Sequence, residues 1–384
     1  MKCLVITPYF PPEVGGACRM LGGIADSLAA EGHSVTVLAF GSGTAAEKQH
    51  DAAASYSVRR VHAQWQNLMT VASMGGALGK LVAKNRFDLI FCGTAYSSAA
   101  LAYLATRLRP SPYVVYSHGE DVTIVGYSMW KRVLLKRALE GSKHTFANSG
   151  FTREALARAG AVDVETLHPS INAAPYLATT DERAERFAIF AGLSGRTENL
   201  LITVARLQER KGHDVVVRAL PMIACQVRNV HYLIVGKGDQ RRILDLAQEL
   251  GVRDRVTIIE SLSESDLADA YRASTLHVLV SRADANKEVE GFGMVYLEAG
   301  AAGRPSVAGD QGGAPEAVVD GVTGVLVDPT SAEETARVIV QLLQDDVRRA
   351  AMGDAARKRT VETFDDSVFL NRIREVCSQH SRVH

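Results

Sequence analysis

The stretch Leu200-Leu-Ile-Thr-Val-Ala-Arg206-Leu-Gln-Glu-Arg-Lys211-Gly-His-Asp214 decides the fold of its half of the chain. Its first six residues are apolar or β-branched and predict a buried strand that ends in a polar turn. Apolar residues at helical spacing from Asp214 to Val227 then predict a helix, and a second buried strand follows at His231–Val235. Such a unit predicts two parallel strands joined by a right-handed crossover.

The same alternation of short apolar runs and helical patterns extends along the whole chain. In the first half the predicted strands are Cys3–Thr7, Ser34–Phe40, Val58–Ala63, Asp88–Cys92, Tyr113–Ser117 and His144–Asn148. In the second half they are Leu200–Ala205, His231–Val235, Arg255–Ile259, Leu276–Ser281, Ser306–Ala308 and Val325–Val327. Strand–helix alternation that occurs twice predicts an α/β protein with two Rossmann-like domains, each with a parallel sheet.

The boundary between these domains is predicted within the irregular, polar stretch 169–198, where a linker is expected at some point. We therefore expect a first domain over residues 1–170 and a second over 171–364. An amphipathic helix over about 365–384 follows the second sheet and is expected to cross back onto the first domain.

Composition excludes several classes of protein. The 384 residues are 47% hydrophobic and 22% charged, which is too apolar for a disordered chain, and a formal net charge of zero does not fit a dedicated nucleic-acid binder. No run approaches the ~18 apolar residues of a spanning helix, and the first residues do not resemble a signal peptide. The five cysteines are scattered without metal-ligand spacing, which predicts free thiols, no metal site and a cytoplasmic location.

The neutral charge conceals a division between the two halves. Residues 1–180 contain 17 Lys and Arg against 12 Asp and Glu, and the remainder contains 26 against 31. A predicted helix that starts at Met129 carries Lys131, Arg132, Lys136 and Arg137. This basic helix could place the first domain on the inner face of a membrane. Alternatively, it is a surface helix that packs Leu134, Leu135 and Leu139 on the sheet while its charges are solvated; the sequence leaves both open.

Two turns that follow predicted strands suit a phosphorylated ligand. Gly15 and Gly16 precede a helix predicted to begin at Met20, and an exposed helix N-terminus binds phosphate. Arg206 and Lys211 flank the turn after the second domain's first strand, where two cations could hold a diphosphate. Neither Gly15-Gly16 nor Gly236-Lys-Gly238 continues as the GxGxxG of dinucleotide enzymes, which argues against hydride transfer.

The segment Glu290-Gly-Phe-Gly-Met-Val-Tyr-Leu-Glu298 places two carboxylates eight residues apart at the start of a predicted helix. Backbone amides there would face an anion, and carboxylates beside a diphosphate suit sugar hydroxyls. The amides expected to face the ligand belong to Gly291, Phe292, Gly293, Met294 and Val295.

Taken together, these motifs resemble the GT-B glycosyltransferases of the retaining family 4. The resemblance rests on Glu290-x7-Glu298, Arg206 with Lys211, Gly15-Gly16, His118-Gly-Glu and Gly312-Gly-Ala-Pro-Glu316, and it covers nearly the whole chain. Within the family, the sequence of these motifs is most similar to that of bacterial α-mannosyltransferases that act on phosphatidylinositol mannosides.

The resemblance implies that the two Rossmann-like domains face each other across a cleft and that the second binds a sugar nucleotide. Arg206 and Lys211 would bind its diphosphate, with the amide of Gly16 closing over it. Glu298 would bind the ribose. Glu290 and the amides of residues 292–294 would hold the transferred sugar, with His118 beside its anomeric carbon. The nucleobase is expected near Gly236–Gly238 and Glu260–Leu262, which do not distinguish guanine from uracil.

The expected activity is retaining transfer of a hexose, with mannose preferred, from a GDP-sugar or UDP-sugar to a hydroxyl of a glycan, glycolipid or small alcohol. Such a reaction belongs to cell-envelope or polysaccharide biosynthesis. No Asp-x-Asp pair is present, so neither a metal nor another cofactor is expected, and nucleic acid is not an expected partner. A sugar-nucleotide epimerase or hydrolase, and a non-catalytic sugar-nucleotide-binding protein, remain as alternatives.

Overall fold

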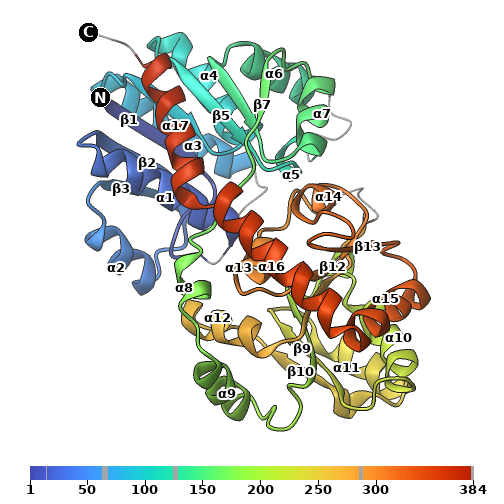
Figure 1. Cartoon of the computed structure of the whole chain (residues 1–384). Coiled ribbons are helices and arrows are strands. Elements are labelled where there is room, and N and C mark those ends of the chain that lie inside the picture. Colours follow the sequence, from blue (N-terminus) through green and yellow to red (C-terminus); the bar gives the residue numbers. More distant parts are fainter. Residues whose placement is uncertain (14, 63–67, 124–128, 285–288, 382–384) are drawn as a thin grey trace. The chain divides into compact units, whose positions relative to one another are not determined.

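The computed structural model describes residues 1–384 apart from 14, 63–67, 124–128, 285–288 and 382–384 (Figure 1). The chain forms two compact units. Unit 1 comprises Met1–Pro169 together with Ser367–His384, and unit 2 comprises Ser170–Asp366. Each is an α/β unit built around one parallel sheet, as the sequence predicts. No helix among the described residues is both long enough and apolar enough to cross a membrane.

Unit 1 is built on a seven-stranded sheet in the order β3-β2-β1-β4-β5-β6-β7, with every neighbouring pair parallel. Its strands are β1 (Lys2–Thr7), β2 (Ser34–Gly41), β3 (Ser57–His62), β4 (Leu89–Cys92), β5 (Tyr113–Ser117), β6 (His144–Ala147) and β7 (Val164–Thr166). The six predicted strands are present with ends shifted by at most one residue; Ala63, the predicted end of the third, lies outside the described residues, and the three-residue β7 was not predicted. The strand order reverses direction between β1 and β4.

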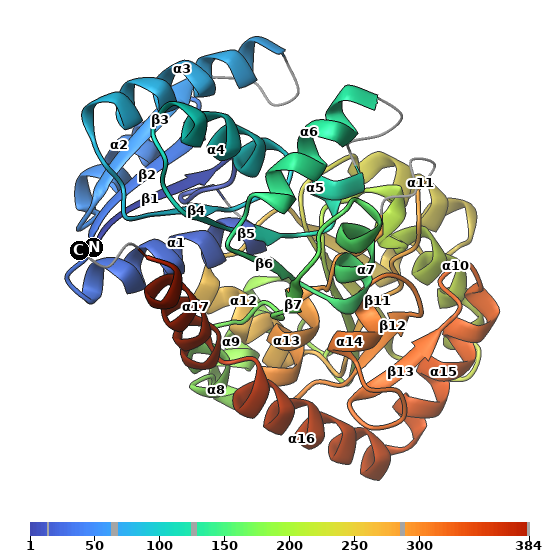
Figure 2. The ribbon, with the colours of Figure 1, turned by 90° about the horizontal axis from the view of Figure 1, so that it is seen from above.

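Helices cover both faces of this sheet (Figure 2). On one face α3 (Leu68–Lys84), α4 (Ser97–Leu108), α6 (Met129–Glu140) and α7 (Gly150–Arg158) contribute to one apolar core. The other face carries α1 (Gly16–Ala30) and α17 (Asp366–His380), which share the second core. The short α5 (Glu120–Thr123) follows β5.

The helix α17 joins unit 1 although it comes last in the sequence. Phe369, Ile373 and Val376 are buried in the same apolar core as residues of β1 and α1, and Figure 1 shows α17 beside unit 1's helix α1. The Arg372 guanidinium donates two hydrogen bonds of 2.8 Å to the Glu165 carboxylate in β7. This terminal helix is therefore part of the first unit; the last three residues of the stretch expected to form it, 382–384, lie outside the described residues.

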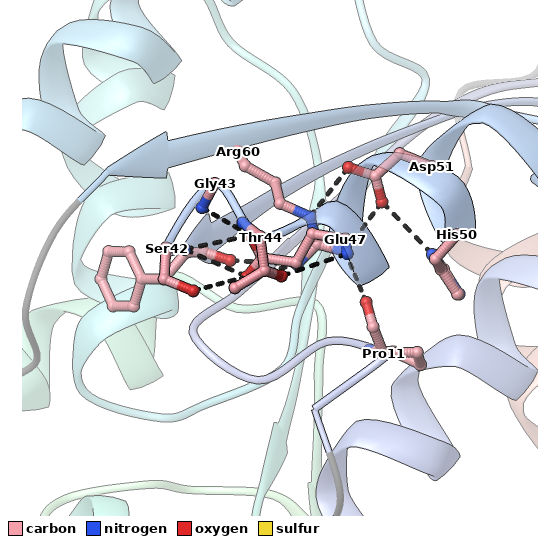
Figure 3. A network of polar contacts seen from close by, with 9 residues as sticks. Pro11, Ser42, Gly43, Thr44, Glu47, His50, Asp51 and Arg60 are labelled. Carbon is pink, nitrogen blue, oxygen red and sulfur yellow. Dashed lines mark hydrogen bonds and ion pairs between the residues drawn. The ribbon is translucent and has the colours of Figure 1, made fainter.

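Between β2 and β3 the chain forms a helix, α2 (Ala45–Ala53), where the sequence showed no pattern. Thr44 and Glu47 form a capping box at its start. The Arg60 guanidinium from β3 donates two 2.8 Å hydrogen bonds to Asp51 and one to the carbonyl of Pro11 (Figure 3). Since α2 buries no residue, polar contacts hold it in place, which is why hydrophobic periodicity did not reveal it.

Unit 2 is built on a six-stranded parallel sheet in the order β10-β9-β8-β11-β12-β13. Its strands are β8 (Asn199–Val204), β9 (Val230–Val235), β10 (Val256–Ile259), β11 (Leu276–Leu279), β12 (Ser306–Gly309) and β13 (Gly324–Val327). The order reverses direction between β8 and β11. That position matters for the site described below.

Two helical layers enclose the sheet of unit 2. One apolar core lies under α10 (His213–Ala224), α11 (Gln240–Glu249) and α15 (Ala332–Gln344). The other lies under α8 (Ala174–Leu177), α9 (Asp181–Phe190), α12 (Glu264–Ala273), α13 (Met294–Ala301) and α14 (Ala314–Ala317). The long α16 (Asp346–Thr363) packs against α13, and 3-10 turns lie at Glu209–Lys211 and Arg253–Arg255.

The stretch 169–198, within which a linker was predicted, contains the division between the units, at Pro169 and Ser170, but it is not irregular. It contains α8 and α9, whose Tyr176, Phe187 and Ala188 are buried in the core of unit 2. Thr180 caps α9 by accepting a hydrogen bond from the amide of Arg183. The polar sequence there is the solvent-facing side of α9, and only a few apolar residues face the core.

Candidate functional site

The site in unit 2 lies where the order of its strands reverses. At such a point the connections after two adjacent parallel strands lead to opposite faces of the sheet and leave a crevice at the carboxyl edge. The turn after β8 carries Arg206 and Lys211, and the segment after β11 leads to Glu290 and the start of α13. The topology therefore brings the two motifs predicted for the diphosphate and the sugar to the same crevice.

Lys211 and Glu290, 79 residues apart in the sequence, touch each other. The Lys211 ammonium donates a hydrogen bond to a carboxylate oxygen of Glu290, and their side chains are only 12% and 14% exposed. Burial alone would raise the pKa of Glu290. The charge and hydrogen bond of Lys211, supported by Arg210, outweigh that effect and hold the pKa below its usual value. Glu290 is therefore an ionised carboxylate that faces a cation.

Arg206, by contrast, is exposed. Its backbone is held from two sides, because its carbonyl accepts a hydrogen bond from the amide of Gln208 (2.7 Å) and lies 3.2 Å from Nε2 of His213. A fixed backbone with an exposed guanidinium is an arrangement that can bind an anion from solvent.

Glycines allow the strand ends to approach one another closely. A Cβ on Gly236, directly after β9, would lie 1.9 Å from the carbonyl oxygen of Ala205. Gly212 has φ +71° and caps α10, and a Cβ there would lie 2.2 Å from the carbonyl oxygen of Val280. Gly238, with φ +145°, approaches Leu207. The proposed nucleobase region around Gly236 and Gly238 thus adjoins the Arg206 turn.

The helix α13 begins directly after Gly293, so its N-terminus lies within the segment whose amides are expected to face a ligand. Gly293 is the N-cap of the helix and has φ +91°. A Cβ at this position would lie 2.4 Å from the ring of Tyr296, so there is no room for a larger residue. The amides of Met294 and Val295 belong to the first turn, whose N–H groups have no partner within the helix. Phe292 is 2% exposed and packs edge-to-face against Phe364, so only its backbone could contact a ligand.

The second carboxylate of the motif, Glu298, is less accessible than the sequence suggested. It is 1% exposed, and it accepts a 3.1 Å hydrogen bond from the hydroxyl of Tyr271. Its predicted contact with a ribose stays a prediction.

The Gly312-Gly-Ala-Pro-Glu316 stretch, used above only as a family signature, supports the Glu290 loop. The amide of Gly313 donates a 2.9 Å hydrogen bond to the carbonyl of Glu290. A Cβ on Gly313 would lie 2.1 Å from the carbonyl oxygen of Gly291. This close backbone contact explains the paired glycines and could have been found from their position after a strand.

In unit 1 the corresponding reversal of strand order lies between β1 and β4. There α1 begins at Gly16, four residues before the predicted start at Met20, with Gly15 as its N-cap. Both glycines therefore lie at a helix N-terminus, which is the feature used to predict phosphate binding. The segment that joins β1 to Gly15 lies within the described residues, apart from residue 14.

His118 follows β5 directly, and a residue that the sequence reasoning missed fixes its loop. The buried carboxylate of Asp121 accepts hydrogen bonds from Ser117 Oγ (2.8 Å), from the amides of His118 and Gly119 (3.1 and 3.0 Å), and from the amide of Ala95 after β4. Asp121 thus ties together the loops that follow two adjacent strands. The Ser-x-x-x-Asp spacing after a strand was the available signal.

Comparison with known proteins gives the family. The model of the family "Glycosyltransferase Family 4" matches residues 14–174, and that of "Glycosyl transferases group 1" matches residues 185–359. A curated protein of Mycolicibacterium smegmatis, a GDP-mannose-dependent alpha-(1-6)-phosphatidylinositol monomannoside mannosyltransferase, is 31% identical over 98% of both chains. The protein with the same description from Mycobacterium tuberculosis is 32% identical over 93% of both.

Solved structures share the fold at lower identity. Anabaena HepE in complex with UDP and glucose superimposes with a TM-score of 0.80 at 21% identity, covering 99% of this chain and 100% of that one. Sucrose-phosphate synthase from Thermosynechococcus elongatus gives a TM-score of 0.81 at 21% identity, with 99% of each chain covered. The two Rossmann-like units are those of the GT-B fold, and the chain belongs to glycosyltransferase family 4 as a hexosyltransferase.

Proposed function

We propose that this glycosyltransferase moves a mannosyl group from GDP-mannose to a hydroxyl of a phosphatidylinositol-based glycolipid, with retention of configuration and without a metal ion. The proposed donor site rests mainly on one observation: Lys211 contacts Glu290 close to the N-terminus of α13, where the strand order of unit 2 reverses. The exposed Arg206 lies in the same turn as Lys211. The choice of mannose and of the acceptor is supported by the relatives of similar length, which are described as GDP-mannose-dependent.

Arg206 and Lys211 would hold the diphosphate of the donor. A guanidinium can bind two phosphate oxygens side by side, while an ammonium acts as a compact charge. Lys211 already lies in the crevice, and a diphosphate would attract it from the Glu290 carboxylate. Glu290 would then accept hydrogen bonds from sugar hydroxyls, with the amides at the start of α13 beside the phosphates.

Transfer is proposed to occur on one face of the sugar. The acceptor oxygen forms its bond to the anomeric carbon as the bond from that carbon to the diphosphate breaks, and the acceptor proton passes to a diphosphate oxygen. Arg206 and Lys211 would stabilise the negative charge that develops, an effect of about 3 kcal/mol per group in comparable sites. No group of three His, Cys, Asp or Glu side chains suited to a metal ion lies among the described residues, so these cations would supply the charge.

Contact with an anionic membrane is proposed through the outward face of α6. Of the three leucines that one interpretation of this helix packs on the sheet, Leu135 and Leu139 are buried and Leu134 is half-buried; Ala138 is buried as well. The outward face nevertheless exposes three apolar residues, Met129 (73%), Trp130 (57%) and Val133 (53%). Basic residues flank them, namely Lys131, Arg132, Lys136 and Arg137. Exposed apolar side chains between cations suit the interface of an anionic bilayer, which would bring the enzyme to a lipid acceptor.

The activity test uses GDP-mannose labelled in the sugar with phosphatidylinositol monomannoside in detergent. We expect a labelled lipid that α-mannosidase cleaves, at a rate unchanged by EDTA. Arg206→Ala and Lys211→Ala should each lower the rate by about 100-fold or more, since each removes a group that stabilises the developing charge. Arg348→Ala, an exposed arginine on α16 of the same unit, is the matched control and should leave the rate unchanged.

Several results would contradict the proposal. Transfer from a UDP-sugar instead of GDP-mannose would refute the donor, and a product resistant to α-mannosidase would refute retention. Breakdown or epimerisation of the donor in the absence of any acceptor would favour a hydrolase or epimerase. Tight binding of the donor without turnover over many acceptors would favour a sugar-nucleotide-binding protein.

The membrane contact is tested separately by sedimentation with vesicles that contain phosphatidylinositol. We expect binding that weakens as salt is raised, and that is lost in both Trp130→Ser and the double variant Lys136→Glu/Arg137→Glu. Binding that is independent of salt and of these substitutions would refute the role of α6 while leaving the donor site untouched.

A further inference from the structure

A buried histidine lies directly behind the cationic turn and has no part in the proposed chemistry. His213 is the first residue of α10 and is 2% exposed. Its Nε2 lies 3.2 Å from the carbonyl oxygen of Arg206, and its Nδ1 lies 3.4 Å from the hydroxyl of Tyr232 in β9. Tyr232 in turn donates a 2.8 Å hydrogen bond to Thr203 in β8, which bonds to the carbonyl of Val278 in β11. His213 thus hydrogen-bonds the carbonyl of the turn and packs against the Tyr232 hydroxyl, whose proton is directed to Thr203.

The contact with Arg206 defines the state of the ring. A carbonyl oxygen can only accept a hydrogen bond, so Nε2 must carry the proton that it donates. Burial lowers the pKa of His213 to about 4, and the nearby Lys211 acts in the same direction. At neutral pH the ring is therefore uncharged, with a proton on Nε2 and a lone pair on Nδ1. A neutral donor fits here because a charged imidazolium would be buried close to the Lys211 cation.

We infer that His213 is a positioning residue of the donor site, which fixes the carbonyl of Arg206 and so holds the turn from Arg206 to Lys211 in the geometry that a diphosphate needs. This inference rests on the proposed donor site. The carbonyl of Arg206 also accepts the amide of Gln208, whereas the amide of Leu207 is bound to Lys237. Without the bond from His213, the peptide that follows Arg206 loses its anchor to α10. The guanidinium then samples more orientations and binds phosphate less often.

A purely structural role would predict something different, and unit 2 contains a matched control. His231 is 3% exposed, its Nε2 lies 2.9 Å from the Thr257 hydroxyl, and burial lowers its pKa to about 4. It lies near the amino end of β9, at the sheet edge opposite to the crevice. If His213 only stabilises the fold, then His213→Leu and His231→Leu should affect nucleotide binding alike.

The experiment measures GDP binding by calorimetry and amide exchange of residues 206–212 in the protein without nucleotide. Since a lost hydrogen bond commonly changes an equilibrium by about two- to tenfold, we expect His213→Leu to weaken GDP binding by about tenfold. His213→Gln, whose side-chain amide can donate to the Arg206 carbonyl, should stay within about threefold of wild type. Exchange in the turn should accelerate in His213→Leu but not in His213→Gln or His231→Leu.

A double-mutant cycle tests the route of the effect. If His213 acts through Arg206, the variant Arg206→Ala/His213→Leu should bind GDP no more weakly than Arg206→Ala alone. Additive losses, or equal losses in His213→Leu and His231→Leu, would overturn the inference. If His213→Leu fails to fold, His213→Asn replaces it, because the shorter side chain of asparagine does not reach the Arg206 carbonyl. If His213→Asn then binds GDP as tightly as His213→Gln does, the inference is overturned.

The outcomes also separate this inference from the proposed function. If wild type binds neither GDP nor UDP, the proposed donor fails, and the exchange rates of the turn alone decide on His213. If wild type binds GDP and His213→Leu binds it equally well with an unchanged turn, only the positioning role is refuted.

Discussion

Replacement of Lys211 by methionine removes the charge that faces the Glu290 carboxylate while it keeps most of the side-chain length. The two side chains are 12% and 14% exposed, so the pair is largely shielded from water. At an effective dielectric constant of 20, two charges 4 Å apart attract by about 4 kcal/mol. Removal of one partner from a buried pair costs about 3–5 kcal/mol because the remaining charge lies without compensation. Since Arg210 still acts on Glu290, we expect Lys211→Met to lose about 3 kcal/mol, the lower end of that range.

The assay must report on unit 2 alone. Both tryptophans, Trp65 and Trp130, belong to unit 1, so fluorescence would follow the other unit. Urea-dependent hydrogen exchange of peptides from β8 and β11, read by mass spectrometry, measures the free energy of unfolding of unit 2. In the double variant Lys211→Met/Glu290→Gln most of the loss should disappear, because the uncompensated carboxylate is gone.

The pair also fixes a dependence on pH. Because the pKa of Glu290 is lowered in the folded protein, its pairing stabilises unit 2 fully above the ordinary carboxyl value of 4.5. This contribution is lost as the pH falls through the lower, folded pKa. Lys211→Met should therefore flatten the decline in stability below pH 4.5. If the effects of Lys211→Met and Glu290→Gln on stability add within about 0.5 kcal/mol, the two groups do not interact and the reasoning is refuted.

Further substitutions test other contacts. Gly236→Ala should destabilise unit 2 by about 3 kcal/mol or more, because its Cβ would lie 1.9 Å from a carbonyl oxygen, whereas Gly251→Ala, with φ +69° and open space around it, should cost about 1 kcal/mol; urea unfolding measures both. Asp121→Asn should cost unit 1 about 2 kcal/mol, since an amide cannot accept all the hydrogen bonds that the carboxylate does, and thermal unfolding checks this. Arg372→Ala should cost about 1 kcal/mol, because its ion pair with Glu165 is partly exposed, and faster amide exchange in α17 would report it. Three buried histidines of unit 2 have lowered pKa values: His213 and His231 at about 4 and His277 at about 3. Between pH 6.5 and 4 these histidines bind protons only in the unfolded chain. The free energy of unfolding of unit 2 should therefore decrease by about 3 kcal/mol per histidine as the pH is lowered through that window, and equal stability at pH 7 and pH 4.5 would contradict this.

Elements with a clear hydrophobic period were predictable, and those held by small or polar residues were not. The buried strands stood out because each is a short run of β-branched and apolar residues. The helix α16 was missed because few of its residues are buried and these include Gly353 and Ala356. The helix α16 can approach α13 closely because the residues at their contact are small: a Cβ on Gly300 of α13 would lie 2.7 Å from Thr360 Oγ1 of α16. Such contacts leave almost no pattern in a single segment.

Site residues differ in the same way. Arg206 and Lys211 were predicted because they lie in the turn that follows a strand, and Glu290 because it shortly precedes a helix; the chemistry of each side chain suits a sugar nucleotide. That Lys211 and Glu290 pair with each other was not predicted, nor were the positions of His213 and Asp121 behind the turns. These side chains are recognised only when their partners, on other strands or loops, are known.

The sequence by itself determined the alternation of strands and helices, the division into two α/β units and the residues that end each strand. Each of these follows from local chemistry: the period of apolar residues, the conformational freedom of glycine and the preference of charged residues for turns. The tertiary structure alone decided the order of the strands, and with it the reversal between β8 and β11 that sets Lys211 against Glu290. That order depends on contacts between residues far apart in the chain, whose energies no local pattern contains.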